Sequence, residues 1–498
     1  MSLSKEWAAL KNGSDIRGVA SEGIEGMTVN LTDETIGRIA AGFVIWVEKK
    51  LNKTDDLTLA VGHDSRISAQ RIKKVCIDSF TSAGVKVLDC GLCTTPAMFM
   101  TCVDKNVNAD ASLMITASHL PFNRNGLKFF TASGGLESSD ITEILEYAQA
   151  NVHAEQSKGQ VVRLDYISAY SKFILDKIIS ETGESKPLAG FKIALDAGNG
   201  AGGFYAKEVL EPLGADISGS VFLDPDGMFP NHVPNPEDKS AMDAISKAVI
   251  DSKSDLGIIF DTDVDRAAVV DETGREINKN RLIALISAIL LEDKPGETIV
   301  TDSVTSTGLK YFIEEELKGK HHRFKRGYRN VINEAIRLNE DGISCPLAIE
   351  TSGHAAMREN YFLDDGAYLV TKILIKMIRL SKEGKKLSDL IVSLKEAKIS
   401  KTFRLPIKAE DFKAYGEKIL KDFSDYVDNI PELTPETHNF EGVRVNCFGG
   451  WFLLRMSLHD PIMPLDLEAD SEEEAYKMIK IFSGFLETYK FLDITSIL

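Results

Sequence analysis

Three carboxylates stand at alternate positions directly after an apolar stretch. The stretch is Leu256–Phe260, and Asp261, Asp263 and Asp265 follow it. Carboxylates crowded at one strand end repel one another unless a cation neutralises them, and a hard cation such as Mg²⁺ takes oxygen ligands. We therefore expect a metal site here, with a solvated acidic turn as the alternative. Arg266 comes next, and its guanidinium suits a phosphate or sugar oxygen beside a metal, or else a surface salt bridge.

A serine with basic neighbours follows a second apolar stretch. Ser118 and His119 follow Ala111–Ile115, and Lys128 lies ten residues after Ser118. Such a serine is either a nucleophile with a cationic partner or a simple turn residue. No G-x-S-x-G surrounds it, which disfavours hydrolase chemistry. Phosphoryl transfer fits better, because Mg²⁺ and basic groups can neutralise a phosphoryl group on the serine oxygen.

Cys90 and Cys93 form a C-x-x-C motif among only six cysteines. No second C-x-x-C or nearby histidine completes a zinc set, so a redox or metal role is disfavoured. Six cysteines are also too few for a disulfide framework in a chain of this length. The N-terminus has no secretory signal pattern. We therefore expect reduced thiols and a cytoplasmic location.

Ser118 and Asp261 occupy equivalent places in a pattern that is repeated along the chain. A short strand rich in β-branched residues is followed by an acidic or small polar residue and then by helix-like periodicity. Strands of this kind predict a parallel sheet covered by helices on both faces, with ligands at the carboxyl ends of the strands. At least five instances occur, at residues 59–64, 113–118, 192–200, 257–261 and 298–306.

The 498 residues suggest three or four domains at roughly 150 residues each. We expect three similar α/β domains with mixed, mostly parallel sheets and a C-terminal α+β domain. The polar stretch near residue 158 and the turn Asp271–Arg275 mark two boundaries. The predicted domains are 1–158, 159–275, 276–396 and 397–498.

Three further segments have clear local character. The proline-rich stretch Asp224–Glu237 predicts a long, stiff loop rather than regular structure. The charged segment Lys382–Lys395 predicts a helix that ends the third α/β domain. Gly450–Arg455 predicts a strand of the last domain.

The charge balance narrows the classes of partner. Lys plus Arg is 58 and Asp plus Glu is 75, which gives a net charge of −17. This excess disfavours a protein that grips nucleic acid or an anionic membrane, and no apolar run reaches the length of a membrane span. An anionic ligand therefore requires a local basic pocket.

Four motifs resemble the α-D-phosphohexomutase superfamily, and they occur in that family's order. They are Ser14-Asp-Ile-Arg17-Gly18, the Thr-Ala-Ser118-His119 segment, the Asp261–Arg266 loop and Glu350-Thr-Ser352-Gly-His354. The resemblance covers essentially the whole chain. It implies phosphoglucomutase, phosphomannomutase or phosphoglucosamine mutase activity, and four domains around a central cleft.

The resemblance also implies roles for individual residues. Ser118 would carry the phosphoryl group, and its phosphate oxygen would bind Mg²⁺ together with Asp261, Asp263 and Asp265. Arg17 and Lys128 would stabilise the phosphoryl group in transfer, and His119, His354 or Lys128 would be the acid/base. Sugar-binding and cleft-lining positions match Glu350, Ser352, Arg266, Lys325 and Arg329, although the basic ones could be plain surface charges.

The family's phosphate-binding loop in the last domain corresponds to Arg455, Ser457 and His459. Arg455 can fork onto a phosphate and Ser457 can donate its hydroxyl. Other positions depart from the family pattern and mark a divergent branch. They are Leu120, Thr262, Val264, Leu458, His459 and Asp466, the last of which stands where some members carry Arg.

The expected function is a mutase that interconverts hexose 1-phosphate and hexose 6-phosphate, of glucose and/or mannose. It would use a phosphoserine and a hexose 1,6-bisphosphate intermediate, which also serves as activator. The alternatives are a hexose-1,6-bisphosphate synthase or phosphoglucosamine mutase of the same fold, a Mg²⁺-dependent sugar phosphatase with Asp261 as nucleophile, and a non-catalytic sugar-phosphate-binding protein. We expect a phosphosugar partner, no nucleic acid or membrane, and a monomer or dimer.

Overall fold

The computed structural model describes residues 2–152, 158–457 and 460–497. The chain forms two units: Met1–Asn278 with Ser352–Leu387, and Lys279–Thr351 with Ser388–Leu498. The first unit therefore combines two stretches that are separated in the sequence. Among the described residues, no helix is long and apolar enough to cross a membrane.

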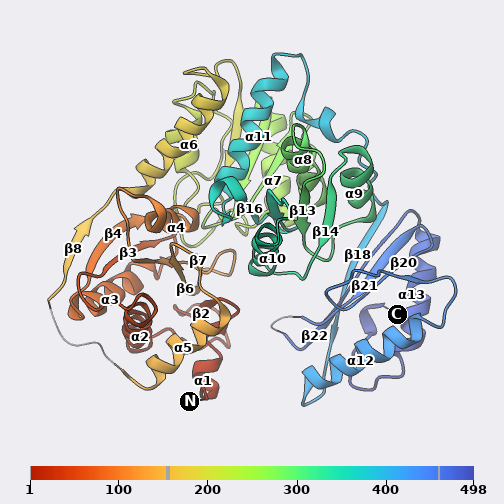
Figure 1. Cartoon of the computed structure of the whole chain (residues 1–498), viewed down its shortest axis with the longest axis horizontal. Coiled ribbons are helices and arrows are strands. Elements are labelled where there is room, and N and C mark those ends of the chain that lie inside the picture. The colour runs from red at the N-terminus through yellow and green to blue at the C-terminus, as the bar shows by residue number, and fades with distance from the viewer. Residues whose placement is uncertain (1, 153–157, 458–459, 498) are drawn as a thin grey trace. The chain divides into compact units, whose positions relative to one another are not determined.

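An eight-stranded mixed sheet forms the centre of the first domain (Figure 1). The strand order is β1-β2-β6-β5-β3-β4-β8, and β7 pairs with β6. The pairs β3/β4, β3/β5 and β4/β8 are parallel, whereas the pairs that involve β1, β2, β6 and β7 are antiparallel. The strands are β1 (Lys11–Asn12), β2 (Asp15–Val19), β3 (Thr58–His63), β4 (Lys86–Leu92), β5 (Ala111–Ile115), β6 (Arg124–Thr131), β7 (Gly134–Gly135) and β8 (Gln160–Arg163).

Three helices cover one face of this sheet and a fourth lies on the other face (Figure 1). Thr32 caps α2 by accepting a hydrogen bond from Thr35 N. The ring of Phe43 in α2 packs 4.5 Å from that of Phe129 in the sheet. The three helices on the first face are α2 (Asp33–Leu51), α3 (Ala69–Ser82) and α5 (Ser138–Gln149). Helix α4 (Thr95–Val103) lies on the other face of the sheet, and a short helix α1 (Lys5–Ala8) comes first in the chain.

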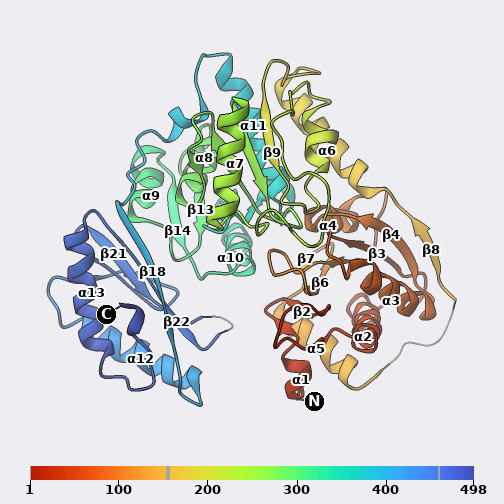
Figure 2. The ribbon, with the colours of Figure 1, turned by 180° about the vertical axis from the view of Figure 1, so that it is seen from behind.

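The second domain has a four-stranded sheet in the order β12-β11-β10-β9. Only β9 and β10 are parallel. Figure 2 shows α7 lying in front of β9. The elements are α6 (Tyr166–Thr182), β9 (Ile193–Asp196), α7 (Lys239–Ser252), β10 (Leu256–Phe260), β11 (Ala267–Asp271) and β12 (Glu276–Ile277), with a π-helical turn at Tyr205–Leu210.

The second stretch of the first unit packs against this domain. It contains β16 (Ala355–Met357), β17 (Leu363–Asp364) and the helix α11 (Gly366–Ser381), which contacts α6, β10 and β11. Asp365 caps α11 by accepting a hydrogen bond from Tyr368 N. As expected, the proline-rich stretch 224–237 contains no helix or strand. It is fastened to β9 by a 2.9 Å contact between His232 Nε2 and Asp196 Oδ2.

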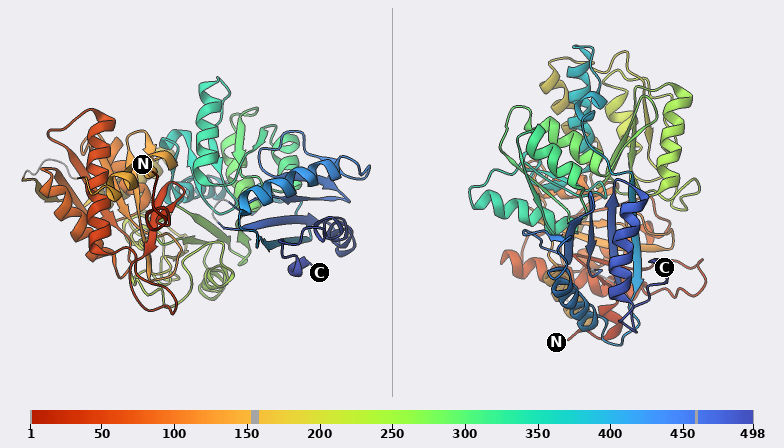
Figure 3. Two further views of the ribbon diagram at one scale, coloured as in Figure 1. Left: turned by 90° about the horizontal axis from the view of Figure 1, so that it is seen from below. Right: turned by 90° about the vertical axis from the view of Figure 1, so that its right-hand side faces the viewer.

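In the second unit, β13 (Thr298–Thr301) forms parallel pairs with β14 (Lys320–Arg323) and with β15 (Leu347–Ile349). The C-terminal sheet, by contrast, is antiparallel throughout, in the order β18-β22-β21-β20-β19. Its helices α12 (Phe412–Val427) and α13 (Glu472–Leu486), blue in Figure 3, share one apolar core with its strands.

The remaining elements of this unit complete the α/β part and the C-terminal sheet. They are α8 (Asn280–Leu291), β13 (Thr298–Thr301), α9 (Thr307–Tyr311), a π-helical turn (Phe312–Glu316), β14 (Lys320–Arg323), α10 (Tyr328–Glu340), β15 (Leu347–Ile349), β18 (Ile399–Pro406), β19 (Thr434–Pro435), β20 (Val443–Cys447), β21 (Gly450–Leu454) and β22 (Ile462–Ala469). The expected fold class, with mixed α/β sheets and a C-terminal domain of helices on a sheet, is confirmed.

The predicted charged helix at Lys382–Lys395 is wrong. Helix α11 ends at Ser381, and only a short 3₁₀ helix, Leu387–Ile391, follows. Gly384 adopts φ +69°, and Lys385 N donates to Leu380 O, which closes the helix end. The charged residues after Ser381 therefore lie in turns, in irregular segments and in this short 3₁₀ helix.

Candidate active site

The loop after β5 holds Ser118 in a left-handed backbone conformation, with φ +51°. Ser118 N donates to Thr116 Oγ1 at 2.9 Å, and the Thr116 hydroxyl donates to Asp64 Oδ2 at 2.7 Å. Left-handed φ is unfavourable for a residue with a Cβ and persists where the surroundings enforce it. The hydrogen bonds of Thr116 and Asp64 supply part of that enforcement.

Arg66 also constrains the backbone of the Ser118 loop, although the sequence analysis did not identify this residue. Its side chain is fully buried and its Nε lies 3.2 Å from Asp64 Oδ2. Both terminal nitrogens donate to backbone carbonyls of the serine loop, so one guanidinium fixes the path of the loop. The acceptors are the carbonyls of Ser118, Leu120, Pro121 and Arg124.

The Ser118 hydroxyl lies between a carboxylate and a guanidinium. Ser118 Oγ donates to Asp261 Oδ2 at 2.9 Å and accepts from Arg266 Nη2 at 2.8 Å. Arg266 Nε also donates to Asp261 Oδ2, at 3.2 Å. The serine loop of the first domain and the carboxylate loop of the second domain therefore meet at one oxygen atom.

His119 lies beside this group as a neutral imidazole. Burial lowers its pKa to about 2, and the charges of Arg266 and Arg17 contribute to the same shift. Arg266 Nη2 donates to His119 Nδ1 at 2.5 Å. Because an arginine can only donate, Nδ1 accepts and the imidazole proton resides on Nε2.

The three loop carboxylates are buried, and one oxygen of each lies within 4.8 Å of the others. Lys128 Nζ donates to Asp263 Oδ2 at 3.0 Å and to Asp265 Oδ2 at 2.5 Å. Thr95 Oγ1 also donates to Asp263 Oδ2, at 2.5 Å. Burial would raise the pKa of Asp265, but the charges of Lys128 and His354 outweigh it and hold that pKa well below its usual range.

Two buried oxygens in this group, Asp263 Oδ1 and Asp265 Oδ1, accept no hydrogen bond within the described residues. Burial raises the pKa of Asp261 well above its usual value, and the charges of Asp265 and Asp263 add to the shift. Such repulsion and unmatched acceptors are relieved by a divalent cation with oxygen ligands. The residues present therefore fit Mg²⁺.

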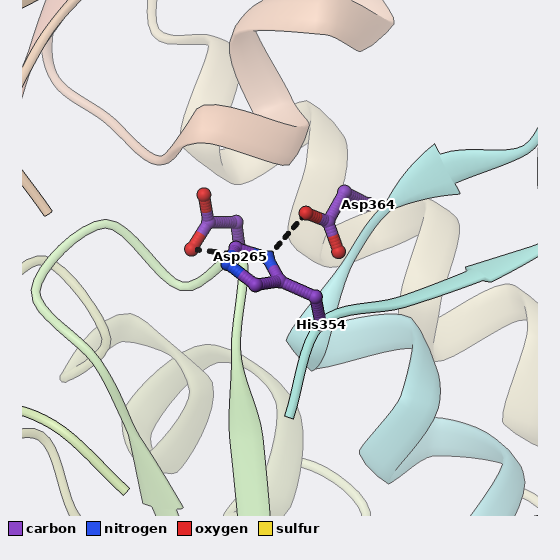
Figure 4. A group of neighbouring side chains, drawn as sticks. All are labelled: Asp265, His354 and Asp364. Carbon is purple, nitrogen blue, oxygen red and sulfur yellow. Dashed lines mark hydrogen bonds and ion pairs between the residues drawn. The ribbon is translucent and has the colours of Figure 1, made fainter. Parts of the chain in front are cut away.

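His354 lies between two carboxylates (Figure 4). Its Nδ1 donates to Asp364 Oδ2 and lies 4.0 Å from Asp265 Oδ1. Ala355 N donates to the other oxygen, Asp364 Oδ1, at 3.0 Å. Burial would lower the pKa of His354, but the charges of Asp364 and Asp265 raise it to about 9.

The segment that carries His354 approaches the carboxylate loop closely. Arg266 and His354 form an antiparallel bridge. Gly353, which precedes His354, adopts φ +94°, and a Cβ there would lie 2.8 Å from Ala267 O, so only glycine fits. Ser352, which precedes it, is buried, and its Oγ has no hydrogen-bond partner among the described residues.

Sequence reasoning missed Asp364, Thr95, Arg66 and Asp64. Asp64 directly follows the apolar strand β3, as Asp261 follows β10, and this pattern could have indicated it; Asp364 ends the two-residue strand β17 and has no such signal. Arg17 lies on β2, where it donates to Asp15 Oδ2 at 2.8 Å, and its charge contributes to the low pKa of His119.

In the second unit, the structure connects two of the predicted sugar-site segments. Gly327 N donates to Glu350 Oε1 at 2.7 Å, so Glu350 is joined to the loop that precedes α10. Lys325 in that loop is exposed, and Arg329 lies in the first turn of α10.

The predicted phosphate-binding loop follows β21. Arg455 Nε donates to Asp466 Oδ2 at 3.4 Å, and Arg455 Nη1 lies 3.9 Å from Glu441 Oε1. Ser457 Oγ accepts a hydrogen bond from Asp460 N at 3.3 Å. His459 lies outside the described residues.

All six cysteines are free and buried. Burial raises the pKa of Cys102 to about 11 and that of Cys93 to about 12, so both thiols are protonated at neutral pH. The candidate metal-ligand groups of the described residues contain no cysteine.

Comparison with known families gives consecutive matches along the chain. Models of the phosphoglucomutase/phosphomannomutase alpha/beta/alpha domains I, II and III match residues 9–155, 165–274 and 278–397. A phosphomannomutase/phosphoglucomutase from Pseudomonas aeruginosa is 30% identical to this chain over 487 residues, which cover 96% of each protein.

Solved structures have the same fold. A phosphoglucomutase/phosphomannomutase family protein from Burkholderia thailandensis matches with a TM-score of 0.78 at 25% identity, over 98% of each chain. An N-acetylphosphoglucosamine mutase from Aspergillus fumigatus, in complex with GlcNAc-6P and magnesium, matches with a TM-score of 0.54 at 12% identity, over 94% of this chain and 93% of that one.

Proposed function

Because the chain belongs to the phosphoglucomutase/phosphomannomutase family of phosphohexomutases, we propose that it interconverts the 1- and 6-phosphates of glucose and/or mannose. The reaction uses a phosphoserine at Ser118 and a hexose 1,6-bisphosphate intermediate, which also serves as activator. The domains that we propose are 1–158, 159–275, 276–396 and 397–498.

The observation that carries this proposal is the position of the Ser118 hydroxyl. It lies 2.8 Å from Arg266 Nη2 and 2.9 Å from Asp261 Oδ2, on a loop fixed in a left-handed conformation. A serine in this setting can hold a phosphoryl group, since the guanidinium can pair with the phosphate oxygens.

In the transfer step, one bond to phosphorus breaks at the serine oxygen and another forms at the sugar oxygen. When phosphoserine donates, the bond between Ser118 Oγ and phosphorus breaks and a bond from the sugar hydroxyl oxygen to phosphorus forms. Arg266 Nη2 stabilises the negative charge that develops on Ser118 Oγ, and Arg17 and Lys128 stabilise the phosphoryl oxygens. In the second half-reaction the other phosphate of the bisphosphate returns to Ser118 Oγ by the reverse steps.

Asp261, Asp263 and Asp265 would hold Mg²⁺ together with a phosphate oxygen on Ser118. The Aspergillus relative of the same fold was solved with magnesium, and the three carboxylates here have the matching donor chemistry. A bound Mg²⁺ neutralises charge on the phosphoryl oxygens. Lys128 holds Asp263 and Asp265 in place through its two hydrogen bonds.

His354 is the group best suited to move the proton of the sugar hydroxyl. Its Nδ1 is held by Asp364 Oδ2, which fixes the orientation of the ring. The other two candidates are less suited, because Lys128 Nζ bonds two carboxylates and the pKa of His119 is lowered to about 2, which makes that imidazole a weak base. The neutral form of His354, which is the minor form at pH 7 because its pKa is about 9, takes the proton at Nε2 when the hydroxyl attacks, and the resulting imidazolium returns the proton when that oxygen leaves.

The remaining predicted residues bind the sugar and the phosphate that is not reacting. Glu350 and Ser352 would bind sugar hydroxyls, because a carboxylate accepts and a hydroxyl both donates and accepts hydrogen bonds. The non-reacting phosphate would bind basic and hydroxyl groups, namely Lys325, Arg329, Arg455, Ser457 and His459.

The test follows hexose 6-phosphate formation from the 1-phosphates of glucose, mannose and glucosamine, with Mg²⁺ and a trace of the matching 1,6-bisphosphate. We expect turnover of glucose or mannose 1-phosphate, and a phosphorylated Ser118 peptide in the mass spectrum. Ser118→Ala is expected to abolish both, whereas Ser133→Ala, at an exposed turn, leaves both unchanged. Full turnover by Ser118→Ala would overturn the phosphoserine mechanism.

One observation favours a second candidate, a hexose-1,6-bisphosphate synthase. The two carboxylates beside Arg455 reduce the positive charge available to hold a bisphosphate through its reorientation. Accumulation of bisphosphate in the same assay, with little 6-phosphate, would support the synthase. Release of inorganic phosphate would instead support a phosphatase.

A further inference from the structure

Two carboxylates flank the Arg455 guanidinium in the C-terminal domain. Asp466 Oδ2 accepts from Arg455 Nε at 3.4 Å, and Glu441 Oε1 lies 3.9 Å from Arg455 Nη1. All three side chains are buried, with exposed fractions of 8% for Arg455 and 10% for each carboxylate. Because the side chains are buried, the electrostatic interactions between these charged groups are stronger than those of an exposed pair.

Asp466 is held in position by a neighbouring strand. Thr402 on β18 lies opposite Asp466 on β22, and Thr402 Oγ1 donates to Asp466 Oδ1 at 2.7 Å. The second carboxylate oxygen is thereby directed toward Arg455. This arrangement depends on a hydroxyl donor and a carboxyl acceptor, which an amide could replace without loss of the hydrogen bond.

Glu441 is held by the α/β part of the same unit. Its Oε2 accepts from Ser303 Oγ at 2.5 Å and from Arg326 N at 3.1 Å. The next residue, Gly442, adopts φ +61°, and a Cβ there would lie 2.1 Å from Leu454 O. The turn therefore packs directly on the residues beside Arg455, and Glu441 has little freedom to move away.

The charge balance around Arg455 is unfavourable for an anion. One guanidinium carries a single positive charge and the two carboxylates carry two negative charges, so the group has a net charge of −1. A phosphate dianion that binds Arg455 must approach both carboxylates and share the guanidinium donors with them.

We propose that Asp466 and Glu441 set the phosphate affinity of the Arg455 site and keep it weak. This inference rests on the proposed function, in which Arg455 binds the non-reacting phosphate of the sugar. Weak phosphate binding at Arg455 shortens the time that the bisphosphate stays bound and so favours its reorientation or release. It also raises the bisphosphate concentration that is needed to keep Ser118 phosphorylated. Asp466 and Glu441 are therefore positioning residues that act through Arg455.

The test measures phosphate affinity directly and needs no turnover. Asp466→Asn keeps an acceptor for Thr402 Oγ1 and removes one charge. We expect calorimetry to give about five- to tenfold tighter binding of inorganic phosphate and of glucose 6-phosphate to Asp466→Asn than to the unmodified chain. The bisphosphate concentration for half-maximal activity is expected to fall by a similar factor. Asp470→Asn, which removes an outer carboxylate paired with Lys395, is the matched control and is expected to change neither value.

Glu441→Gln provides a second variant, because glutamine retains an acceptor for Ser303 and Arg326 N. Tighter phosphate binding in either variant, without a change in the control, supports the inference. Equal or weaker binding in both variants, or no phosphate binding by any form of the chain, overturns it. Absence of mutase turnover in the unmodified chain would overturn the proposed function, and the calorimetric result would still decide the inference.

Discussion

Lys128 Nζ lies 3.0 Å from Asp263 Oδ2, and both side chains are buried. This pair places a fixed cation on one side of the three-carboxylate group and leaves Asp263 Oδ1 and Asp265 Oδ1 without a hydrogen-bond donor in the described part of the chain. The lysine therefore compensates only part of the negative charge, and the remainder is available to a metal ion.

Asp263→Asn is expected to remove metal binding. Mg²⁺ at 100 times its Kd stabilises a folded protein by about 2.7 kcal/mol, so the unmodified chain should unfold at a higher temperature with Mg²⁺ than with EDTA. The variant should show no such difference, and its kcat should fall at least about 100-fold. Thermal unfolding with and without Mg²⁺ checks this, with Asp243→Asn, an exposed partner of Lys239, as control. Equal Mg²⁺ stabilisation of variant and unmodified chain would contradict the metal assignment.

Arg66→Lys is expected to loosen the serine loop. Lysine lacks the planar guanidinium group with which Arg66 donates to four carbonyls. Several charged hydrogen bonds, worth about 1.5–3 kcal/mol each, are therefore lost or weakened. We expect a lower thermal midpoint, faster proteolysis at residues 118–124 and a kcat reduced more than about tenfold. Arg38→Lys, whose partner is the exposed Glu34, should leave all three values unchanged. An intact loop with normal kcat would show that Arg66 is dispensable.

Asp364→Asn tests the orientation of His354. The amide keeps a similar shape but can present either oxygen or nitrogen to His354 Nδ1, so the ring loses its fixed tautomer. We expect kcat to fall about 10- to 100-fold with KM changed less than about twofold, because the defect lies in proton transfer rather than in binding. Steady-state kinetics measure the separate effects on kcat and KM, and Asp341→Asn serves as the control. A raised KM at unchanged kcat would assign Asp364 to binding instead.

The contact between His232 and Asp196 predicts a pH-dependent stability. Burial lowers the pKa of His232, but the hydrogen bond and the charge of Asp196 raise it more, so this pKa lies above its ordinary value. A raised pKa in the folded state gives stability that is fully present below about pH 6.5 and is lost as pH rises through the folded pKa.

We therefore expect His232→Gln to lower the thermal midpoint more at pH 6 than at pH 9. The exposed His438→Gln serves as control. A difference that grows toward pH 9 would contradict the assigned direction.

The sequence predicts the central strands well, because fully apolar runs bounded by polar residues leave little choice of structure. Ala111–Ile115 and Leu256–Phe260 are strands with the expected bounds. The three carboxylates after Leu256–Phe260 are expected to gather, because they stand at alternate positions directly after one strand. In the structure Asp261, Asp263 and Asp265 lie together beside Ser118.

Other features depend on pairings that local sequence does not encode. The antiparallel pairing of β6 with β2 and β5 brings Lys128 to the carboxylates, and nothing in its own segment specifies that register. The contacts of Arg455 with Glu441 and Asp466 join a turn and two strands. The end of α11 was missed because a charged stretch was interpreted as a helix, although Gly384 closes it.

The first unit is built from two stretches of chain, and the second, Ser352–Leu387, contributes His354, Asp364 and α11. During synthesis, the first 278 residues are complete long before α11 exists. Until α11 is synthesised, the surface that it contacts on α6 and β11 has no partner, and transiently exposed apolar surface of this kind favours association of nascent chains. A premature stop between Asn278 and Ser352 would thus yield an aggregation-prone product rather than a smaller working enzyme.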